Sequence, residues 1–402
     1  MTREPDVVVV GAGIVGLAVA RELLARQPGR AVTVLEREPV PGFHQTGHNS
    51  GVLHAGIYYA PGSLRARLST AGSRELFAYC QERGLPARRD GKLIVATSDA
   101  ERPRLDELER RGRANGVPGL RRLGPAEMAE IEPHVRGVEG LHSPHTAVVD
   151  FQAIAAAFAQ DVATAGGEVV TGCEVLGVEP RGSAISLRHA AGESVARFAI
   201  FCAGAWSDRL AVAAGGEPDP RIVPFRGAWL RLRPERRDLV RALVYPVPDP
   251  SLPFLGVHFT RGTDDEVLVG PTALLAAARD AYSLRTVRPA DVRSTLSWPG
   301  TYRMARRWWR TGLQELRHAA SRRALVADAA RYIPELREDD VLPGPAGVRA
   351  QALGRDGALI DDFVVSESPN ALHVRNAPSP AATSCLPLAR LIVDRVPTIP
   401  RP

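Results

Sequence analysis

The stretch Asp6-Val7-Val8-Val9-Val10-Gly11-Ala12-Gly13-Ile14-Val15-Gly16 decides how this chain folds. Its four consecutive valines are typical of a strand that is buried on both faces of a parallel sheet. The glycine turn leads into an apolar run, Leu17–Leu24, that predicts a helix, and a second strand, Val32–Leu35, ends at Glu36. Strand, glycine turn, helix, strand and acid thus fall within about thirty residues, which is the pattern of a dinucleotide-binding βαβ unit.

The glycines and the helix start in this stretch are each suited to binding a pyrophosphate. Gly11 allows the tight turn, Gly13 lets the backbone approach the phosphates, and Gly16 lets the helix pack closely on the strand. The N–H groups at the helix start, at Ile14 and Val15, are oriented to donate to phosphate oxygens. Because the flanking elements fit the same unit, we interpret the turn as a nucleotide site rather than an ordinary βαβ connection.

The acid at the end of the second strand narrows the choice of nucleotide. Glu36, followed by Arg37, is positioned to accept hydrogen bonds from the ribose hydroxyls of an adenosine. Its negative charge repels a 2′-phosphate, which disfavours NADP. FAD and NAD both use this unit, so the choice between them depends on residues farther along the chain.

A segment rich in glycine and histidine follows, from His44 to Tyr59. It has little hydrophobic periodicity, and loops of this kind let a backbone come close to a flat ligand. Its candidates for contact with the cofactor are Thr46, Gly47, Asn49, Ser50 and Gly51. A surface loop with chance histidines is the alternative. A metal site is not expected, because no carboxylate lies at ligand spacing from the histidines.

Composition places the chain among ordinary folded proteins. It has 402 residues, 45% of them hydrophobic and 24% charged, so it is neither disordered nor a polytopic membrane protein. Its four scattered cysteines predict reduced thiols. The net charge of +6 comes almost entirely from arginine, since Lys92 is the only lysine. Codon preference or an anionic partner explains this bias. Nucleic acid is not the expected partner, because the sequence contains no basic run with interleaved aromatic residues.

Two segments bear on location. The apolar run Val7–Ala20 mimics a signal peptide, but the residues before it are not net positive and it is too short to span a bilayer. Arg303–Arg310, which includes Trp308 and Trp309, could touch a membrane surface; a helix with its tryptophans turned inward is the preferred interpretation. We expect a cytoplasmic protein with at most peripheral contact at the inner face of the membrane, in an oligomeric state that is left open.

The rest of the chain divides into two kinds of segment. The cofactor domain continues with a helix at Phe151–Ala165, strands at Glu168–Val170, Cys173–Val178, Phe198–Cys202 and Ala371–Val374, and a helix at Leu386–Val393. The other segments have no glycine turn; they hold strands at Lys92–Thr97, Ala228–Leu232, Phe254–Thr260 and Glu266–Gly270, and a long helical stretch at Asp291–Arg331. We assign the cofactor domain to 1–88, 145–222 and 340–402, and a substrate domain to 89–144 and 223–339.

Motifs spread along the chain resemble those of one enzyme family. They are His44–Tyr59, Pro61–Leu64, Pro224–Gly227, Pro246–Arg261, Pro345–Gln351, Leu359–Phe363 and Asn376–Ser384. They are similar to L-2-hydroxyglutarate oxidases and dehydrogenases, within the D-amino-acid-oxidase-like FAD-dependent oxidoreductases. The resemblance covers essentially the whole chain. It implies an α/β fold, α+β overall, in which a Rossmann-like FAD-binding domain carries a discontinuous substrate domain on a mixed or antiparallel sheet.

The same resemblance implies a reaction and further cofactor contacts. An L-2-hydroxy acid, L-2-hydroxyglutarate or a close relative, would be oxidised to the 2-oxo acid, with electrons passed to oxygen or a quinone. Val175 would place its backbone against the adenine, and Ala203 and Gly204 would pass near the pyrophosphate. The last helix starts near the segment Pro380, Ala381, Ala382, Thr383 and Ser384. Its positive end would face the pyrimidine edge of the flavin.

Oxidation of a hydroxy acid needs a base for the hydroxyl proton while the hydride leaves for flavin N5. Histidine suits this role because its ordinary pKa is about 6.5. The candidates are His54, in the loop that approaches the flavin, and His258, expected in the middle of a strand of the substrate sheet. His54 is placed slightly ahead, and a purely structural histidine is the alternative for each.

Arginines would hold the carboxylates of the substrate. Arg349 with Gln351 is the first candidate, Arg226 is the second, and Arg261 is a third. A salt bridge to Asp361-Asp362 is the structural alternative for Arg349. Hydrogen-bond donors to the substrate could come from Tyr58, Tyr59 and Tyr245.

One segment departs from the family pattern. After Gly270-Pro271, family members carry an amide where this chain has Thr272, and an aromatic and a basic residue where it has Ala277 and Ala278. Loss of this bulk and charge would widen or neutralise the pocket. A second hypothesis is therefore an FAD enzyme for another hydroxy acid or an amine. A nucleotide-binding protein without turnover and an NAD-dependent dehydrogenase are the remaining ones.

Overall fold

A parallel sheet forms around the first strand, as the sequence predicts. The computed structural model describes residues 5–250, 252 and 254–397. The sheet has six strands in the order β20-β21-β13-β1-β2-β9. They are β1 (Val7–Val10), β2 (Val32–Leu35), β9 (Glu168–Val170), β13 (Phe198–Phe201), β20 (Val364–Ser368) and β21 (Ala371–Asn376). β1 pairs in parallel with both β2 and β13, whereas the edge strand β20 is antiparallel to β21.

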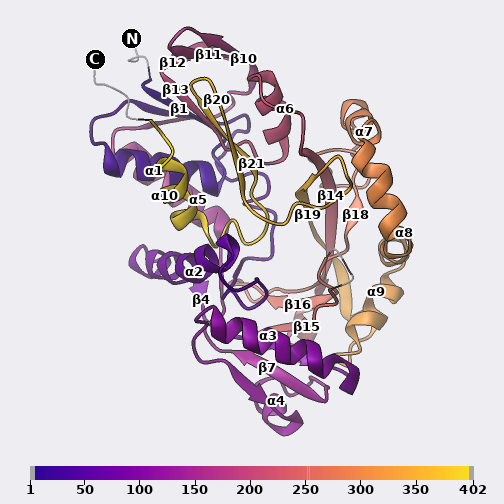
Figure 1. The fold of residues 1–402 in the computed structure, drawn as a ribbon. Helices are drawn as coiled ribbons and strands as arrows, with labels where there is room; N and C mark the ends of the chain where they lie inside the picture. The colour runs from indigo at the N-terminus through magenta and orange to yellow at the C-terminus, as the bar shows by residue number, and fades with distance from the viewer. Residues whose placement is uncertain (1–4, 251, 253, 398–402) are drawn as a thin grey trace.

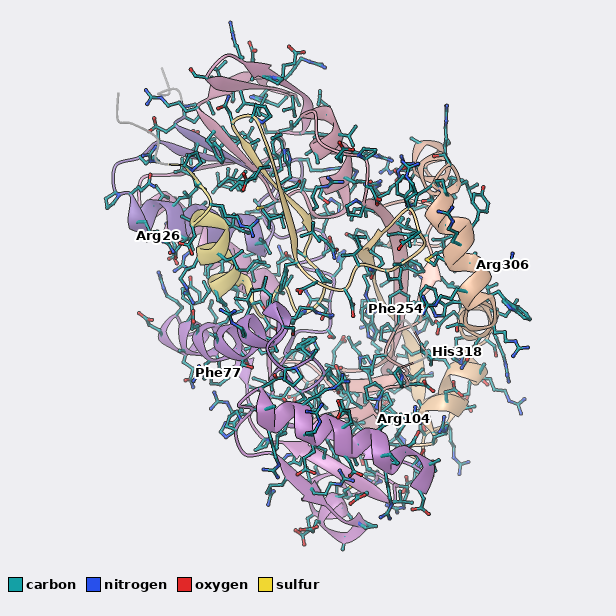
Figure 2. The ribbon with its side chains drawn as sticks, viewed as in Figure 1. Arg26, Phe77, Arg104, Phe254, Arg306 and His318 are labelled. Carbon is teal, nitrogen blue, oxygen red and sulfur yellow. The ribbon has the colours of Figure 1, made fainter. Side chains whose placement is uncertain are left out.

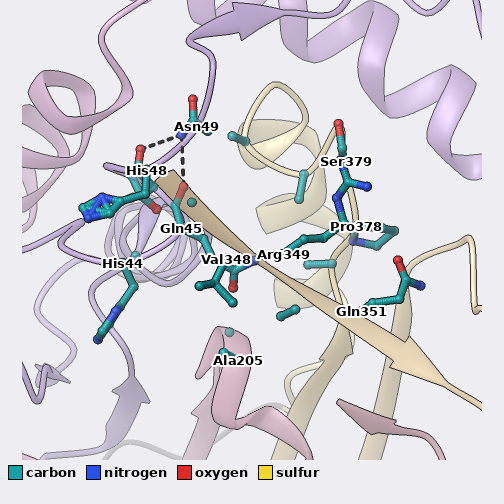
Figure 3. Close-up of a pocket in the computed structure, with 18 of the residues that line it drawn as sticks. His44, Gln45, His48, Asn49, Ala205, Val348, Arg349, Gln351, Pro378 and Ser379 are labelled. Carbon is teal, nitrogen blue, oxygen red and sulfur yellow. Dashed lines mark hydrogen bonds between the residues drawn. The ribbon is translucent and has the colours of Figure 1, made fainter. Parts of the chain in front are cut away.

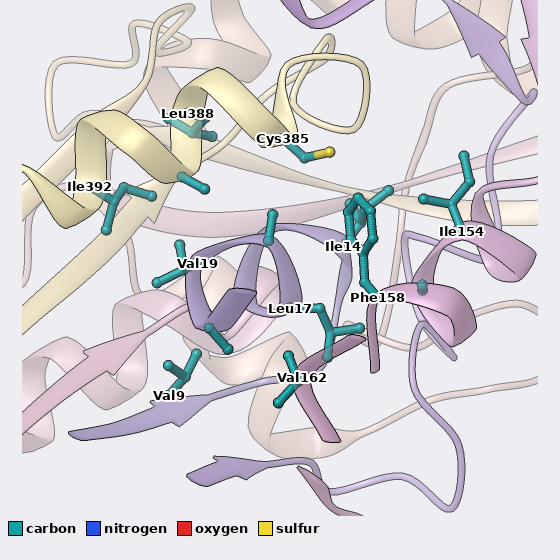
Figure 4. Close-up of a cluster of buried hydrophobic side chains, with 14 of the residues drawn as sticks. Val9, Ile14, Leu17, Val19, Ile154, Phe158, Val162, Cys385, Leu388 and Ile392 are labelled. Atoms are coloured by element: carbon teal, nitrogen blue, oxygen red, sulfur yellow. The ribbon is translucent and has the colours of Figure 1, made fainter. Parts of the chain in front are cut away.

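The valines of β1 are buried because both faces of this sheet are covered. Val7 and Val9 belong to a core formed with α1 (Ile14–Arg26), α2 (Leu64–Glu82), α5 (Phe151–Thr164) and α10 (Cys385–Val393); Figure 4 shows Val9 in this cluster. Val8 and Val10 pack instead against a small sheet of β10 (Val175–Arg181), β11 (Ala184–His189) and β12 (Gly192–Ala196). Each buried valine side chain stabilises the fold by about 1.5–3 kcal/mol.

A second, larger sheet forms the other main part of the molecule (Figure 1). Its order is β18-β14-β17-β16-β15-β5-β7-β6, and β19 pairs with β14. The strands are β5 (Lys92–Ala96), β6 (Arg121–Leu123), β7 (Glu139–Ser143), β14 (Arg221–Leu232), β15 (Leu243–Pro246), β16 (His258–Arg261), β17 (Val267–Gly270), β18 (Leu274–Leu275) and β19 (Val341–Leu353). β5 and β15 are parallel and the other strand pairs of the described residues are antiparallel, so the sheet is mixed. The predicted fold class is confirmed.

Shorter elements join and cover the two sheets. A three-stranded sheet consists of β3 (Val52–Leu53), β8 (Ala147–Val149) and β4 (Ala87–Arg88). The other helices are α3 (Arg102–Ala114), α4 (Pro125–Ile131), α6 (Ser207–Ala213), α7 (Pro289–Leu296), α8 (Pro299–Ala320) and α9 (Arg322–Ala329). Short 3-10 helices lie at Asp99–Glu101, Gly204–Trp206, Pro234–Leu239 and Glu338–Asp340. In Figure 1, α7, α8 and α9 line the outer side of the large sheet, and α3 and α4 lie at its far end.

Two predicted strands differ from the structure in their bounds or in the sheet to which they belong. The strand expected from Cys173 begins at Val175 and belongs to the small sheet rather than the parallel one. The strand expected at Phe254–Thr260 is wrong in its first half: β16 begins only at His258, after Gly256, and glycine commonly interrupts strands. His258 therefore starts a strand and does not lie in the middle of one.

The long helical stretch at Asp291–Arg331 is three helices. Pro299 begins α8, where its missing N–H costs nothing, and the Ser321 side chain accepts from the Ala324 N–H to cap α9. The expectation of inward tryptophans is wrong for Trp309, whose exposed fraction is 56%, while Trp308 is half-buried at a kink in α8. Within the described ranges, no helix is both long enough and apolar enough to cross a bilayer.

The division into two domains stays a proposal. The predicted boundary at 340 would place β19 with the cofactor domain, yet β19 pairs along β14 from Val341 to Leu353. We therefore count β19 with the large sheet in this proposal. The two sheets face each other across the candidate site.

Candidate active site

A cavity of about 1010 Å³ lies between the carboxyl ends of the parallel strands and the large sheet. Its wall on the parallel sheet includes Gly11, Gly13 and Ala203, at the ends of β1 and β13. The opposite wall includes Tyr245 of β15 and Arg349 of β19. Figure 3 shows part of this lining, with β19 running through the view. Ligands of open α/β sheets bind at this end of the strands.

The glycine turn has the geometry that was predicted for it. Gly11 has φ +103°, and a Cβ there would lie 2.6 Å from the Cys202 carbonyl oxygen. A Cβ on Gly16 would lie 2.0 Å from the Gly11 carbonyl oxygen, so only glycine lets α1 start this close to β1. Gly16 does not line the cavity itself; it brings the helix start to it. Ile14 and Val15 line the cavity, and the Ile14 N–H donates to Thr46 Oγ1 over 3.0 Å.

The acid after β2 is fixed by backbone hydrogen bonds. Glu36 Oε2 accepts from the Ala12 N–H at 2.7 Å, and Oε1 accepts from the Glu38 N–H at 2.9 Å. Each oxygen keeps a second lone pair for a ribose hydroxyl. Arg37 lies beside it in the cavity wall, with its guanidinium carbon 4.2 Å from the centre of the Trp206 ring.

The loop after Glu36 holds itself in shape while facing the cavity. The Asn49 amide, labelled with Gln45 in Figure 3, donates to the carbonyls of Gln45 (3.0 Å) and Thr46 (2.7 Å) and accepts from the Gly51 N–H (2.8 Å). Thr46, Asn49 and Ser50 line the cavity. Gly47 and Gly51 do not. A Cβ on Gly47 would lie 2.3 Å from Gln152 Oε1, and Gly51 has φ +70°, so these two glycines shape the loop from behind.

Two more turns complete the cofactor side of the cavity. Val175, Ala203 and Gly204 line it, as do Pro380, Ala381, Ala382 and Thr383. Ser384 precedes α10 and is buried behind the cavity wall. Thr383 Oγ1 accepts from the His54 N–H at 3.1 Å, and a Cβ on Gly72 would lie 2.3 Å from the Thr383 carbonyl oxygen. The start of α10 is therefore packed between α2 and the loop that carries His54.

Both candidate bases face the cavity and have depressed pKa values. Burial lowers the pKa of His54 well below its ordinary range, with further contributions from Lys92, His258 and Arg65. Burial lowers the pKa of His258 to about 4. His258 Nδ1 lies 2.9 Å from the Gly256 carbonyl oxygen, which assigns the proton to Nδ1 and leaves Nε2 as an acceptor. His54 Nδ1 is buried and makes no hydrogen bond within the described residues.

Arg349 presents an unneutralised guanidinium to the cavity. It pairs with Phe225 across β19 and β14, is exposed to the cavity, and its guanidinium carbon lies 4.5 Å from the centre of the Phe254 ring. Removal from bulk water lowers its pKa, and nearby Arg65 lowers it further. The expected salt bridge to Asp361 does not form, because Asp361 Oδ1 lies 3.1 Å from Arg65 Nη1. Gln351, on the same strand face, donates to the carbonyls of Ala352 (3.1 Å) and Ile360 (3.2 Å) and also lines the cavity.

The two other arginine candidates do not reach the cavity. Phe225 and Gly227 line it, so Arg226 between them points to the other face of β14, where Nη2 donates to the Tyr282 carbonyl at 3.3 Å. Arg261 donates to Asp265 Oδ1 at 3.0 Å and to the Val240 carbonyl at 3.1 Å. Neither Arg226 nor Arg261 is therefore placed to bind a substrate carboxylate in the cavity.

The divergent segment lies only partly at the cavity, and its widening of the pocket stays a prediction. Thr272 lines the cavity, but its Oγ1 accepts from the Ala228 N–H at 3.1 Å, so the hydroxyl is engaged with the sheet. Neither Ala277 nor Ala278 lines the cavity, and Ala278 is fully buried in a separate cluster with Val348. The two alanines are therefore not part of the cavity wall.

Two candidate functional residues, Arg65 and Lys92, were not predicted from the sequence. Arg65, in the cavity wall, donates to the carbonyls of Asp361 (2.6 Å) and Ser379 (2.5 Å) and lies 4.6 Å over the Tyr59 ring. Lys92 is buried behind Tyr58 and Tyr245, which both line the cavity. The signal for Arg65 was its position directly after the Pro61–Leu64 motif, and for Lys92 it was being the only lysine.

Known proteins share both sequence and fold with this chain. The profile described as FAD dependent oxidoreductase matches residues 6–395. The mitochondrial L-2-hydroxyglutarate dehydrogenase of Homo sapiens is 45% identical over 412 residues, covering 98% of this chain and 89% of that protein. The L-2-hydroxyglutarate dehydrogenase of Escherichia coli (strain K12) is 41% identical over 395 residues, covering 98% and 93%.

Solved structures extend the likeness of fold. L-alpha-glycerophosphate oxidase from Mycoplasma pneumoniae with FAD bound has a TM-score of 0.79 at 23% identity, covering 98% of this chain and 94% of that chain. Glycine oxidase from Geobacillus kaustophilus has a TM-score of 0.69 at 20% identity, covering 98% and 96%. At these identities the likeness concerns the fold alone.

Proposed function

This chain belongs to the FAD-dependent oxidoreductase family, and we propose on that premise that it oxidises L-2-hydroxyglutarate, or a closely related L-2-hydroxy acid, to the 2-oxo acid. The observation that carries the proposal is Arg349: a cation without an acidic partner in the described residues, exposed to a cavity between a dinucleotide-binding turn and two histidines. A carboxylate is the natural ligand of such a guanidinium.

The residues of the cavity fit FAD. The turn from Gly11 to Gly16 has no room for a Cβ at either end, and Glu36 keeps lone pairs for a ribose. We assign the pyrophosphate to this turn with Gly204, and the pyrimidine edge of the flavin to the turn before α10. When bound, FAD supplies the acceptor for the hydride.

Two cations are available for a five-carbon dicarboxylate. Arg349 would hold one carboxylate in a bidentate pair. Arg65 is near enough for its charge to lower the pKa of Arg349, and two such cations side by side favour a dianionic ligand. Arg65 already donates to two carbonyls and is paired with Asp361, so Arg349 is the primary clamp and Arg65 only supplements its charge.

One of the two histidines would take the hydroxyl proton. We place His258 first, because its Nδ1 contact with Gly256 leaves Nε2 unprotonated, and its depressed pKa keeps it neutral. His54 is the second candidate. Tyr58 and Tyr245 line the same wall and would donate hydrogen bonds to the substrate; burial raises their pKa values, so both hydroxyls stay protonated.

The decisive experiment is an anaerobic substrate panel on the purified yellow enzyme. L-2-hydroxyglutarate is expected to bleach the flavin absorbance, with its D-enantiomer, L-malate, L-lactate and a set of amines for comparison. The proposal fails if the hydroxyglutarates leave the colour unchanged and another acid or an amine bleaches it. Bound FAD that no compound reduces would instead indicate a binding protein without turnover.

We propose that the electron acceptor is oxygen or a quinone. We also propose that the protein is cytoplasmic and at most peripheral to the membrane. The outer face of α8 supports peripheral contact: Trp309, Leu313 and Leu316 are each 56% exposed. Four exposed arginines of α8 form no ion pair within the described residues: Arg306, Arg307, Arg310 and Arg317. Figure 2 shows Arg306 on this outer side. Apolar side chains flanked by arginines suit an anionic bilayer surface.

Vesicle sedimentation tests this contact. The enzyme is expected to bind phosphatidylglycerol vesicles and not phosphatidylcholine vesicles, and the double variant Leu313→Ser/Leu316→Ser is expected to lose binding. Arg110→Gln/Arg113→Gln on α3 removes two exposed arginines elsewhere and serves as the charge control. A change in oligomeric state without vesicle binding would point to contact between copies of this chain instead.

A further inference from the structure

Lys92 is the single lysine of a chain whose other basic residues of this kind are all arginines. Of 51 basic residues it is the only lysine, and its side chain in β5 is buried, with an exposed fraction of 1%. Its Nζ lies 4.1 Å from the centre of the Tyr245 ring and 5.2 Å from that of Tyr58. No carboxylate of the described residues lies within 4.0 Å of this ammonium, which faces two aromatic rings instead.

Tyr245 connects Lys92 to one of the two candidate bases. Tyr245 stacks on His258, with ring centres 4.1 Å apart and planes 27° apart. Tyr58 follows His54 in the same loop, and both line the cavity. Lys92 is absent from the cavity lining, so it acts from behind the tyrosines and does not touch the substrate.

The charge of Lys92 acts on the histidines in one direction. It lowers the pKa of His54 and also that of His258, because an ammonium nearby disfavours a second positive charge. The same burial lowers the pKa of Lys92 itself to about 7. Unlike arginine, lysine can therefore lose its proton at this position, and its charge is present on the acid side of neutrality.

On the basis of the proposed function, we propose that Lys92 is a positioning residue for the catalytic base: held behind Tyr58 and Tyr245, its ammonium keeps the imidazoles of His54 and His258 unprotonated when the solution is acidic. Such a device extends the working range of the base downward, where a histidine would otherwise be protonated. Arg65 and Arg349 act on the histidines from the cavity in the same sense.

Other titratable groups near β5 do not replace this effect. Lys92 pairs in register with Leu243 of β15 and Ser143 of β7, neither of which titrates. His142 of β7 is opposite Leu93, so it lies on the alternate face of the sheet. Facing Lys92 itself are the two tyrosines, and burial keeps both in the neutral, protonated form.

Lys92→Met and Lys92→Arg in the holoenzyme separate charge from packing. The readout is the rate of anaerobic flavin reduction against pH, with whichever panel substrate bleaches the wild type. Loss of the charge in Lys92→Met is expected to move the acid limb upward by about one pH unit with little change in KM. Lys92→Arg, which keeps the charge, is expected to restore the limb. Leu93→Met, a neighbour of equal burial on the other face, is the control and should leave the limb in place.

Two outcomes would overturn the proposal. One is an unshifted acid limb in Lys92→Met that still binds FAD. The other needs no variant: because Lys92 is the only lysine, untagged holoenzyme labelled with ε-¹³C-lysine gives one side-chain resonance, whose midpoint is expected near neutral pH. A midpoint below about pH 5 would leave no charge where the histidines need it. If the wild type is reduced by no substrate, the proposed function fails while this resonance still reports on Lys92.

Discussion

Arg65 Nη1 lies 3.1 Å from Asp361 Oδ1, so the acid expected to neutralise Arg349 is paired with a different cation. Arg349 is left facing the cavity as a guanidinium whose pKa is lowered by its surroundings. A substrate carboxylate would complete it, and binding would relieve the cost of holding two cations close together.

Arg349→Ala is expected to lower kcat/KM for L-2-hydroxyglutarate by about 10²-fold or more, mostly through KM, because a desolvated charge pair with the substrate is lost. Stopped-flow reduction against substrate concentration gives both constants. Arg226→Ala is the matched control, since Arg226 lies on the same sheet and points away from the cavity. It should change kcat/KM by no more than about threefold; equal losses in the two variants would refute the clamp.

His258→Gln is expected to slow flavin reduction by about 10²–10⁴-fold at neutral pH while FAD stays bound, as for loss of a general base. In the wild type the unprotonated imidazole is present above its pKa of about 4, so the rate should fall as the pH drops through that value. His54→Gln is measured in parallel. If both variants reduce the flavin at the normal rate, neither histidine is the base.

Acid sensitivity of the fold follows from His373, which is stacked on Phe201 and whose pKa burial lowers to about 4 from the ordinary 6.5. Between these two pH values His373 is protonated in the unfolded chain and unprotonated in the folded chain. The free energy of unfolding should therefore decrease as the pH falls from about 6.5 to 4. Tm against pH for the wild type and for His373→Gln checks this: the variant should show a shallower decline, whatever its Tm at pH 7. Parallel curves would contradict the assignment.

Gly16→Ala should abolish FAD binding and destabilise the fold, because the new Cβ would lie 2.0 Å from the Gly11 carbonyl oxygen. Gly312→Ala in α8 meets nothing within 4 Å and should stabilise the protein by about 0.5–1 kcal/mol, since alanine is the better helix former. Visible absorbance and Tm report both effects. Retention of FAD by Gly16→Ala would mean that α1 can withdraw from β1.

Local patterns predicted the βαβ unit and the close approach of its helix to its first strand, because Gly16 contacts Gly11 within the same turn. The contact of Gly11 with Cys202, after β13, is long-range and is visible only in the fold. The substrate side was different. Which of Phe225 and Arg226 faces the cavity depends on pairing with β19, far along the chain, and no local pattern contains that register.

Charged residues with distant partners were the hardest to assign. The isolation of Arg349 becomes visible only when Asp361 is seen beside Arg65. Likewise, Lys92 stands directly before an unremarkable apolar run in the sequence, Leu93–Ala96, and only the fold places Tyr58 and Tyr245 around it. The kink in α8 at Trp308 and the exposure of Trp309 are likewise not revealed by helix propensity.

The packing of the Thr383 turn onto α2 and the His54 loop has a consequence for biosynthesis. The Thr383 turn and the turn at Gly11 line the same cavity, but most of the described sequence lies between them. A nascent chain can therefore form the βαβ unit early, but it cannot close this wall of the cavity until the segment of α10 has been translated.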